Sequence, residues 1–241
     1  IDEFLRQCVR TNRPEFMNPL WGGLNVAGFA GEVIAALTNQ SMYTYELSPI
    51  ATLIEQAIVE RMMEIVGYAE GFGTLTTGGS NGNMMGMLCA RQASHPMSSI
   101  TGFDGSKYVA FVSAEAHYSV LMSANVVGIG YQNLVKVACD SRGRMKPESL
   151  VEEIVRARTN GQTPFCIIAT SGTTVRGAFD PLKEIANIAH DNNIWLHVDA
   201  AWGGSSLFSK RFRKLMDGVE LADSVCSVSY THLTLPTIKR V

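Results

Sequence analysis

The chain has 241 residues, of which 46% are hydrophobic and 17% charged, with Lys+Arg 20 against Asp+Glu 22. This composition can bury a sizeable core and excludes an intrinsically disordered chain, and the balanced charge argues against nucleic acid or an anionic membrane as a partner. The sequence contains no apolar run of about 18 residues and no signal-peptide pattern, so we expect no membrane association.

Cysteine usage indicates a reducing compartment. The five cysteines are scattered without a Cys-x-x-Cys pair, and their odd number does not fit a disulfide framework. We therefore expect a cytoplasmic protein with free cysteines and no metal site.

Residues 1–47 are interpreted as an N-terminal segment that leads into the main domain. A helix is predicted between Ser48 and Gly67, because Ser48 can cap it, Pro49 occupies its first position and Gly67 can end it. Its apolar residues recur at helical spacing, which predicts that the helix packs on a core. These residues are Ile50, Leu53, Ile54, Ala57, Ile58, Met62 and Ile65.

Further along the chain, short apolar runs alternate with helical stretches. Runs typical of strands occupy residues 108–113, 165–170 and 194–200, and helices are expected near His117 and after Asp180, which can cap the second one. Strands separated by helices predict an α/β fold with a mostly parallel sheet and flanking helices. In such folds, ligands gather outside the carboxyl ends of the strands.

A glycine-rich turn at residues 78–83 is the first candidate site, between an extended stretch at 73–77 and an apolar helix at 84–91. Free backbone N–H groups and the positive end of a helix favour phosphate there, and the Ser80 hydroxyl adds a donor. A plain turn that starts a helix explains this pattern alone equally well.

A carboxylate near the end of a buried strand is the second candidate. Asp199 lies in the apolar run 194–200, where an unpaired carboxylate is costly, so it needs a cationic partner or good hydrogen bonds. The alternative is an aspartate that caps the following turn. His197 faces the same side of the strand, either as a packing residue or as a group that orients the carboxylate.

Two further strand ends carry polar side chains. His117 lies just past the 108–113 strand, where it either contacts a ligand or only packs. Residues 170–174 form a hydroxyl-rich loop, and such hydroxyls often satisfy only local backbone. Together the four features offer a phosphate site, a flat ring, hydroxyls and a buried anion to one crevice. A flat, cationic phosphate ester would satisfy all four.

Short motifs stand in a fixed order along the chain. They are Thr-Gly-Gly-Ser-Asn-Gly-Asn at 77–83, Ala-His at 116–117, Ser-Gly-Thr-Thr at 171–174 and His-Val-Asp-Ala-Ala at 197–201. In this order they resemble the group II pyridoxal-phosphate-dependent amino-acid decarboxylases, in the branch of glutamate and cysteine-sulfinate decarboxylases. The resemblance runs from about Pro14 to Val225 and includes segments at 18–24 and 42–49.

This resemblance implies the large domain of a fold-type I pyridoxal-phosphate-dependent transferase, truncated before completion, with pyridoxal 5'-phosphate as cofactor. Gly79 and Ser80 would hold the cofactor phosphate. His117 would stack on the pyridine ring, Ala201 would pack near its other face, and Thr174 would hydrogen-bond near the cofactor.

The resemblance also implies that His117 and Asp199 are the catalytic residues. Asp199 would pair with the protonated pyridine nitrogen, which keeps the ring an electron sink when carbon dioxide departs. Thr44 and Tyr45 would shape the substrate end. Family members normally work as dimers, so a homodimer is expected of the full-length protein.

The lysine with which this family forms a Schiff base to the cofactor is absent from its expected place. After residue 226 the match ends abruptly, and in ungapped register Thr231, which cannot form the imine, occupies the lysine position. Lys239 lies too far along the chain to replace it. The abrupt change predicts an appended sequence or a frameshift. The predicted divisions are an N-terminal segment (1–47), an incomplete cofactor-binding domain (48–226) and a non-native tail (227–241).

The predicted function is decarboxylation of a small acidic amino acid, namely glutamate, aspartate or cysteine sulfinate, although the chain as it stands would be inactive without the lysine. Glutamate is in doubt because Pro19 lacks the amide donor that glutamate-specific members carry there. A non-catalytic homologue or dimer partner is the main alternative. A nucleotide-binding oxidoreductase, with Asp104 as its ribose-binding acid, would leave Asp199 and His117 unexplained.

Overall fold

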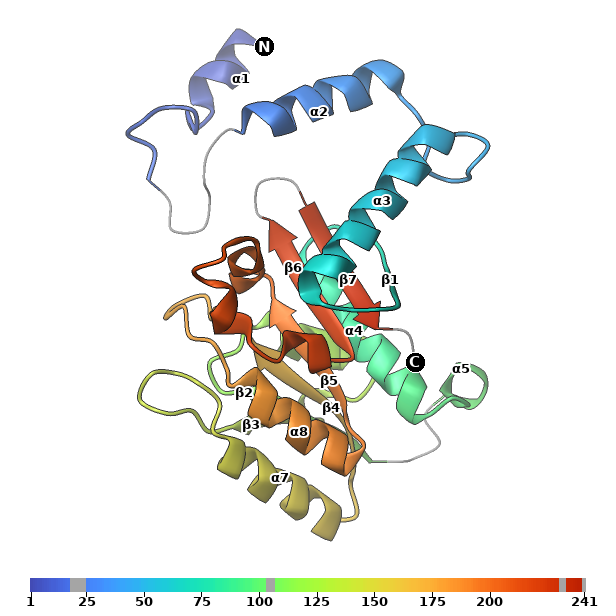
Figure 1. Cartoon of the computed structure of the whole chain (residues 1–241), viewed down its shortest axis with the longest axis vertical. Helices are drawn as coiled ribbons and strands as arrows, with labels where there is room; N and C mark the ends of the chain where they lie inside the picture. Colours follow the sequence, from blue (N-terminus) through green and yellow to red (C-terminus); the bar gives the residue numbers. More distant parts are fainter. Residues whose placement is uncertain (18–24, 103–106, 230–232, 240–241) are drawn as a thin grey trace.

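The fold is that of a computed structural model, which describes residues 1–17, 25–102, 107–229 and 233–239. Its strands are β1 (Gly71–Gly73), β2 (Tyr108–Ser113), β3 (Leu134–Val137), β4 (Thr163–Thr170), β5 (Trp195–Ala200), β6 (Ser224–Ser229) and β7 (Leu233–Lys239). They form one sheet in the order β1-β7-β6-β5-β4-β2-β3 (Figure 1). Neighbours from β3 to β6 pair in parallel, whereas β7 runs antiparallel to β6 and β1. The predicted α/β class with a mostly parallel sheet is confirmed.

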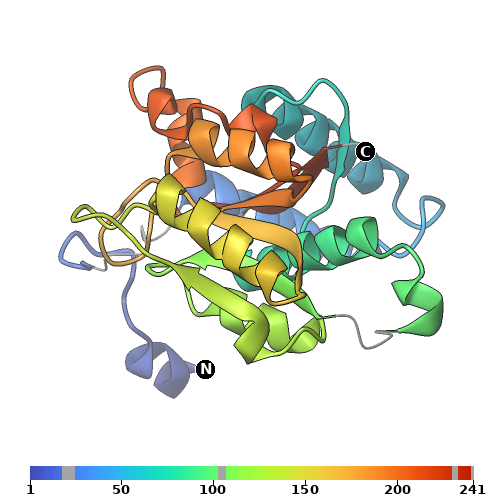
Figure 2. The same cartoon turned by 90° about the horizontal axis from the view of Figure 1, so that it is seen from below.

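Helices pack on both faces of the sheet (Figure 2). The α-helices are α1 (Asp2–Gln7), α2 (Val26–Thr38), α3 (Pro49–Val66), α4 (Gly79–Ser94), α5 (Ser98–Thr101), α6 (Ser119–Val126), α7 (Pro147–Thr159) and α8 (Leu182–Asn192). Short 3₁₀ segments lie at Tyr131–Asn133, Gly203–Phe208, Arg213–Met216 and Val219–Leu221. Helices α4 and α6 pack on one face of the sheet, and α7 and α8 pack on the other.

The strand β2 shows why the core has two layers. Successive residues of a strand point to opposite faces of the sheet. Val109 and Phe111 therefore join the core under α7 and α8, while Tyr108, Ala110 and Val112 join the core under α4 and α6. Every residue of β2 is buried, as expected of a central parallel strand covered on both faces.

The helix predicted between Ser48 and Gly67 is α3, and its boundaries agree with the prediction. Gly67 ends the helix in the left-handed region at φ +103°, where its N–H donates to the carbonyl of Met63. The Ser48 side chain makes no capping bond; its hydroxyl donates to Oε1 of Gln40 instead, at 2.9 Å.

The prediction that α3 packs on a core is confirmed only for its second half. Ile50, Leu53 and Ile54 in its first half are exposed, and the buried side chains, Val59, Met62 and Val66, lie toward its end. The reason is position, because the first half of α3 projects beyond the sheet together with α1 and α2 (Figure 1). Neither α1 nor α2 has a buried residue.

Asp180 does not cap α8 as expected. Pro181 holds the capping position, and the Asp180 carboxylate accepts hydrogen bonds from the backbone N–H groups of Met145, at 2.6 Å, and Thr170, at 2.7 Å. Burial raises the pKa of Asp180 to about 6, against the opposing effect of these two bonds. The carboxylate thus ties the end of β4 to the chain that enters α7.

The predicted boundary at residue 226 lies inside β6, and part of the predicted tail, residues 233–239, forms β7 between β6 and β1. β7 therefore pairs with β6 on the side away from β5. Alternating Leu and Thr residues at 233–235 are typical of a strand. The non-native origin of this tail stays a prediction, and Thr231 lies outside the described residues, as do residues 18–24 and Asp104.

The five cysteines are free, as expected. Within the described parts of the chain, no helix combines the length and the apolar character needed to cross a bilayer.

Gly86 allows α4 to approach β5 closely, because a Cβ atom at this position would collide with the ring of His197. We expect Gly86→Ala to lower the free energy of unfolding by about 1–3 kcal/mol through overpacking, although alanine favours helix more than glycine does. Equilibrium urea unfolding of both proteins measures the difference. The matched control is Gly31→Ala in α2, which meets no atom within 4 Å and should be stabilising. Equal changes in the two variants would contradict the steric explanation.

Candidate functional site

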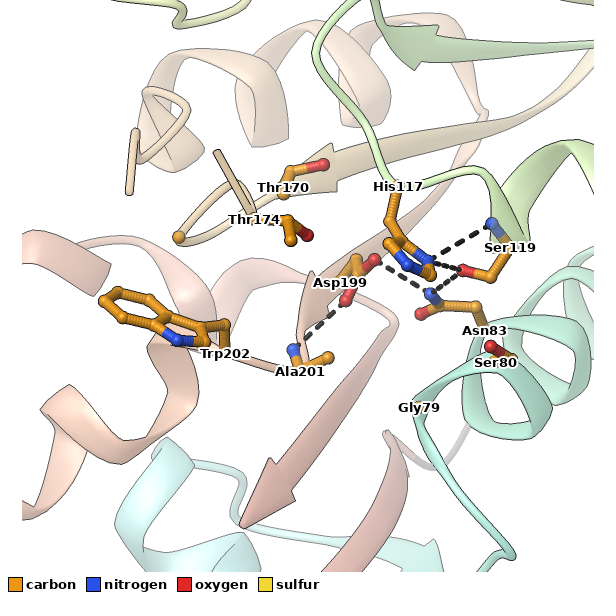
Figure 3. A pocket seen from close by; sticks show the side chains of 11 residues that line it. Gly79, Ser80, Asn83, His117, Ser119, Thr170, Thr174, Asp199, Ala201 and Trp202 are labelled. Carbon is orange, nitrogen blue, oxygen red and sulfur yellow. Dashed lines mark hydrogen bonds between the residues drawn. The ribbon is translucent and has the colours of Figure 1, made fainter. Parts of the chain in front are cut away.

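A pocket of about 270 Å³ opens at the carboxyl ends of β4 and β5, beside the first turn of α4 (Figure 3). The structure brings together in its lining all the residues predicted to hold the cofactor. They are Gly79, Ser80, His117, Thr174, Asp199 and Ala201. The convergence follows from parallel pairing, which places the carboxyl ends of neighbouring strands at one edge of the sheet.

The first turn of α4 forms one end of the pocket. The helix begins at Gly79 directly after Gly78, and no side chain caps it. The first N–H groups of a helix have no partner within the helix, and the helix dipole makes this end positive. Gly79 and the exposed Ser80 therefore offer donors to an anion such as a phosphate.

Asp199 forms the buried, acidic part of the pocket and is 4% exposed. Its Oδ2 accepts a hydrogen bond from Nδ2 of Asn83 at 2.8 Å, and its Oδ1 accepts one from the N–H of Ala201 at 3.1 Å. Burial raises the pKa of Asp199, and the two hydrogen bonds and the nearby His117 oppose that rise. Among the described residues, no Lys or Arg forms an ion pair with this carboxylate, so a cationic ligand would complete it.

His117 is held by its own neighbour at the entry to α6. Nδ1 of His117 accepts from the N–H of Ser119 at 3.2 Å and lies 2.8 Å from the Ser119 hydroxyl. That hydroxyl also accepts from Nδ2 of Asn83 at 3.2 Å, so it has a hydrogen to donate to His117. These bonds leave the face and the Nε2 edge of the ring for a ligand (Figure 3).

The motifs assigned no role to several lining residues, namely Asn83, Ser119, Thr170, Gly172 and Trp202. Three of them, at positions 83, 170 and 172, lie inside the candidate turn and loop. Their place in these segments was the only sequence feature that indicated a role in the site. The Thr170 hydroxyl is buried without a hydrogen-bond partner, which is costly unless a ligand supplies one. The Trp202 ring lies beside Gly172, where an added Cβ atom would approach its Cε3 atom to 2.9 Å.

The predicted substrate residues Thr44 and Tyr45 do not line this pocket. They precede α3 in the part of the chain that projects from the sheet (Figure 1). Their role at the substrate end stays a prediction.

The lining fits a ligand with an anionic group at one end and a cationic, flat group at the other. The helix N-terminus suits the anion, the buried Asp199 carboxylate suits the cation, and the Thr170 hydroxyl awaits a partner. Within the described parts of the chain, no group of three or more His, Cys, Asp or Glu side chains is placed to hold a metal ion.

Comparison with known proteins identifies relatives along nearly the whole chain. A family model for the pyridoxal-dependent decarboxylase conserved domain matches residues 1–233. The chain is 45% identical over 232 residues to the acidic amino acid decarboxylase GADL1 of Mus musculus, covering 93% of this chain and 42% of that protein. It is 42% identical over 222 residues to the cysteine sulfinic acid decarboxylase of Homo sapiens, covering 92% of this chain and 45% of that protein. The crystal structure of mouse CSAD in apo form has a TM-score of 0.96 at 37% identity, covering 99% of this chain and 52% of that one.

The chain spans less than half the length of these two curated relatives. The likeness to mouse CSAD confirms the expected fold-type I architecture, and the family match confirms pyridoxal phosphate as the cofactor of the family. Because the family model matches nearly the whole chain, the chain belongs to the pyridoxal-dependent decarboxylase family.

Proposed function

We propose that a full-length protein containing this chain removes carbon dioxide from an acidic amino acid with the help of pyridoxal phosphate. The observation that carries this proposal is the buried Asp199 carboxylate, which lacks a cationic side-chain partner among the described residues and shares a pocket with the N-terminus of α4. The names of the relatives support an acidic substrate, and aspartate and cysteine sulfinate are the preferred candidates.

Four of the lining residues have a task in this reaction. Gly79 and Ser80 bind the phosphate through backbone and hydroxyl donors, and His117 covers one face of the ring. Asp199 holds a proton on the ring nitrogen by pairing with it. When bound, the cofactor supplies a cationic ring that accepts the electron pair released as carbon dioxide leaves.

We further propose that the 241-residue chain is itself inactive, because Thr231 would occupy the position of the lysine that holds the cofactor covalently if the family's motif continues in ungapped register. The full-length protein would be a cytoplasmic homodimer. Exposed apolar side chains on α2, such as Val26, Ile34 and Leu37, support a second copy as the partner that covers them.

Titration of the chain with pyridoxal phosphate, followed by absorbance and tryptophan fluorescence, tests the proposed cofactor site. We expect weak, reversible binding, and borohydride treatment should trap no adduct at a defined lysine. Ser80→Ala should weaken this binding by about tenfold, since it removes a hydrogen bond to a charged group. The matched control is Ser99→Ala, on an exposed serine of α5 outside the pocket, which should bind as the parent does.

Two results would contradict the proposal. Equal binding by the parent and by Ser80→Ala would remove the phosphate site from the first turn of α4. An adduct trapped at one lysine, mapped by peptide mass spectrometry, would show that the chain does hold the cofactor covalently.

A further inference from the structure

A continuous line of buried hydrogen bonds runs along one face of β5 beneath α4. Trp195, His197 and Asp199 occupy alternate positions of β5, so they share that face. Ser224 of β6 and Asn83 of α4 connect them, and all five residues are buried. The line starts at the far end of the strand and ends at the carboxylate in the pocket.

The hydrogen atoms of this line have one consistent arrangement. Nδ2 of Asn83 donates to Oδ2 of Asp199 at 2.8 Å. Oδ1 of Asn83 then faces Nε2 of His197 at 3.1 Å, and this nitrogen must carry a hydrogen. Burial lowers the pKa of His197 to about 4, so the ring is neutral at pH 7 and its Nδ1 only accepts.

The far end of the line agrees with this direction. The Ser224 hydroxyl lies 2.8 Å from Nδ1 of His197 and therefore donates to it. It in turn accepts from the indole N–H of Trp195 at 2.9 Å, a group that can only donate. With the indole N–H donating at one end and an ionised Asp199 accepting at the other, all the bonds between them run in one direction.

Asn83 is consequently locked in one orientation. Rotating its amide by half a turn would set its oxygen against the Asp199 carboxylate and its NH₂ group against the Nε2 hydrogen of His197. The same NH₂ group also donates to the Ser119 hydroxyl, which holds His117. One buried amide therefore contacts both the acid and the support of the ring-stacking histidine.

We propose that Asn83 is a positioning residue that keeps Asp199 ionised and aimed into the pocket, and that His197 acts through Asn83 by fixing its amide. Asn83 provides the one side-chain hydrogen bond to this carboxylate in the described residues, while the second bond comes from the backbone of Ala201. The inference rests on the proposed function, because an ionised Asp199 serves catalysis only when a cationic ring binds.

Titration of Asp199 in the cofactor-free chain tests this inference directly. We expect Asn83→Leu to raise the pKa of Asp199, followed by ¹³C NMR of its carboxyl carbon, by about one to two pH units, since a hydrogen bond to a charged group is lost. The matched control is Asn125→Leu at an exposed position of α6, which should leave this pKa unchanged. If Asn83→Leu does not fold, Asn83→Ala provides the same comparison.

The role of His197 has its own pair of variants. His197→Gln retains an N–H donor near the position of Nε2, so it should keep the pKa of Asp199 close to that of the parent. His197→Leu removes the donor and should raise that pKa, although both variants alter packing under α4. Long-range ¹H–¹⁵N NMR of the parent should show the His197 hydrogen on Nε2 and no titration of the ring between pH 5 and 8.

An unshifted Asp199 in the Asn83 variants, or a hydrogen on Nδ1 of His197, overturns the inference. These readouts need no cofactor, so they separate it from the proposed function. No pyridoxal phosphate binding by the parent chain, together with the expected pKa shift in Asn83→Leu, refutes the proposed function alone. Normal binding with an unshifted pKa refutes the role of Asn83 alone.

Discussion

Asp199→Ala should abolish carbon dioxide release in a full-length protein that carries these residues, with a loss of about 10³-fold or more in kcat/KM. The substitution removes the buried charge that would hold a proton on the ring nitrogen, and removing even one neutral donor from a site of developing charge costs ~10²–10³-fold. Because Asp199 lies in the pocket lining, the variant also enlarges the pocket. The measurement is release of ¹⁴CO₂ from carboxyl-labelled aspartate and cysteine sulfinate.

Asp199→Asn separates charge from shape, because the amide has nearly the same size as the carboxylate. We expect it to lose nearly as much activity as Asp199→Ala, and its melting temperature should fall modestly, because its NH₂ group would face one of the two donors that bind the carboxylate. Asp217→Ala, at an exposed position outside the pocket, is the matched control and should remain fully active. Normal turnover by Asp199→Asn would rule out the electrostatic role.

The stability of the chain should fall in acid because His197 is buried as a neutral ring. Its folded pKa of about 4 lies below the unfolded value of about 6.5, so the unfolded state binds more protons between these values. The stabilising contribution is therefore complete above pH 6.5 and is lost as the pH falls toward 4. Its size is about 3 kcal/mol, from 1.36 kcal/mol for each pH unit.

Comparing variants with the parent isolates the effect of His197 on the free energy of unfolding, because the protonation of Asp180 changes that free energy in the opposite direction. The pKa of Asp180 in the folded state is raised to about 6, so as the pH falls the folded state binds a proton before the unfolded state does. The contribution of Asp180 to the free energy of unfolding therefore increases as the pH falls through that value. Urea unfolding at pH 7.5 and pH 4 should show that the free energy of unfolding falls less between these two pH values for His197→Gln than for the parent. His190→Gln, on an exposed ring of α8, should behave as the parent does. Equal acid loss in the parent and in His197→Gln would contradict the assignment.

Three neighbouring strands in the middle of the sheet could be predicted from local pattern. The apolar run at 108–113 coincides with β2, and the runs at 165–170 and 194–200 differ from β4 and β5 only at their ends. These strands are buried on both faces, so their sequences are continuously apolar and easily recognised. The helix α3 was equally clear, but the exposure of Ile50 and Leu53 depends on where the helix lies, which its periodicity does not encode.

The sequence predicted which residues form the site better than it predicted the contacts between them. Gly79, His117 and Asp199 were marked by position at strand ends and by their motifs. Asn83 was visible only as the last residue of a glycine-rich turn, because its contact with Asp199 joins residues 116 positions apart. The prediction that Asp180 caps α8 failed for a similar reason, since Met145 competes for its carboxylate across the fold.

The position of Asn83 on α4 has a consequence for ligand selection. Gly79 and Ser80 begin the helix, and Asn83 follows about one turn later, at a rise of ~1.5 Å per residue. A rigid rod therefore sets the spacing between the anion-binding end and the group that aims the acid. If the anion site and Asp199 act as proposed, this fixed spacing should favour a ligand whose anionic and cationic groups are separated to match, so pyridoxal without its phosphate should bind more weakly than pyridoxal phosphate.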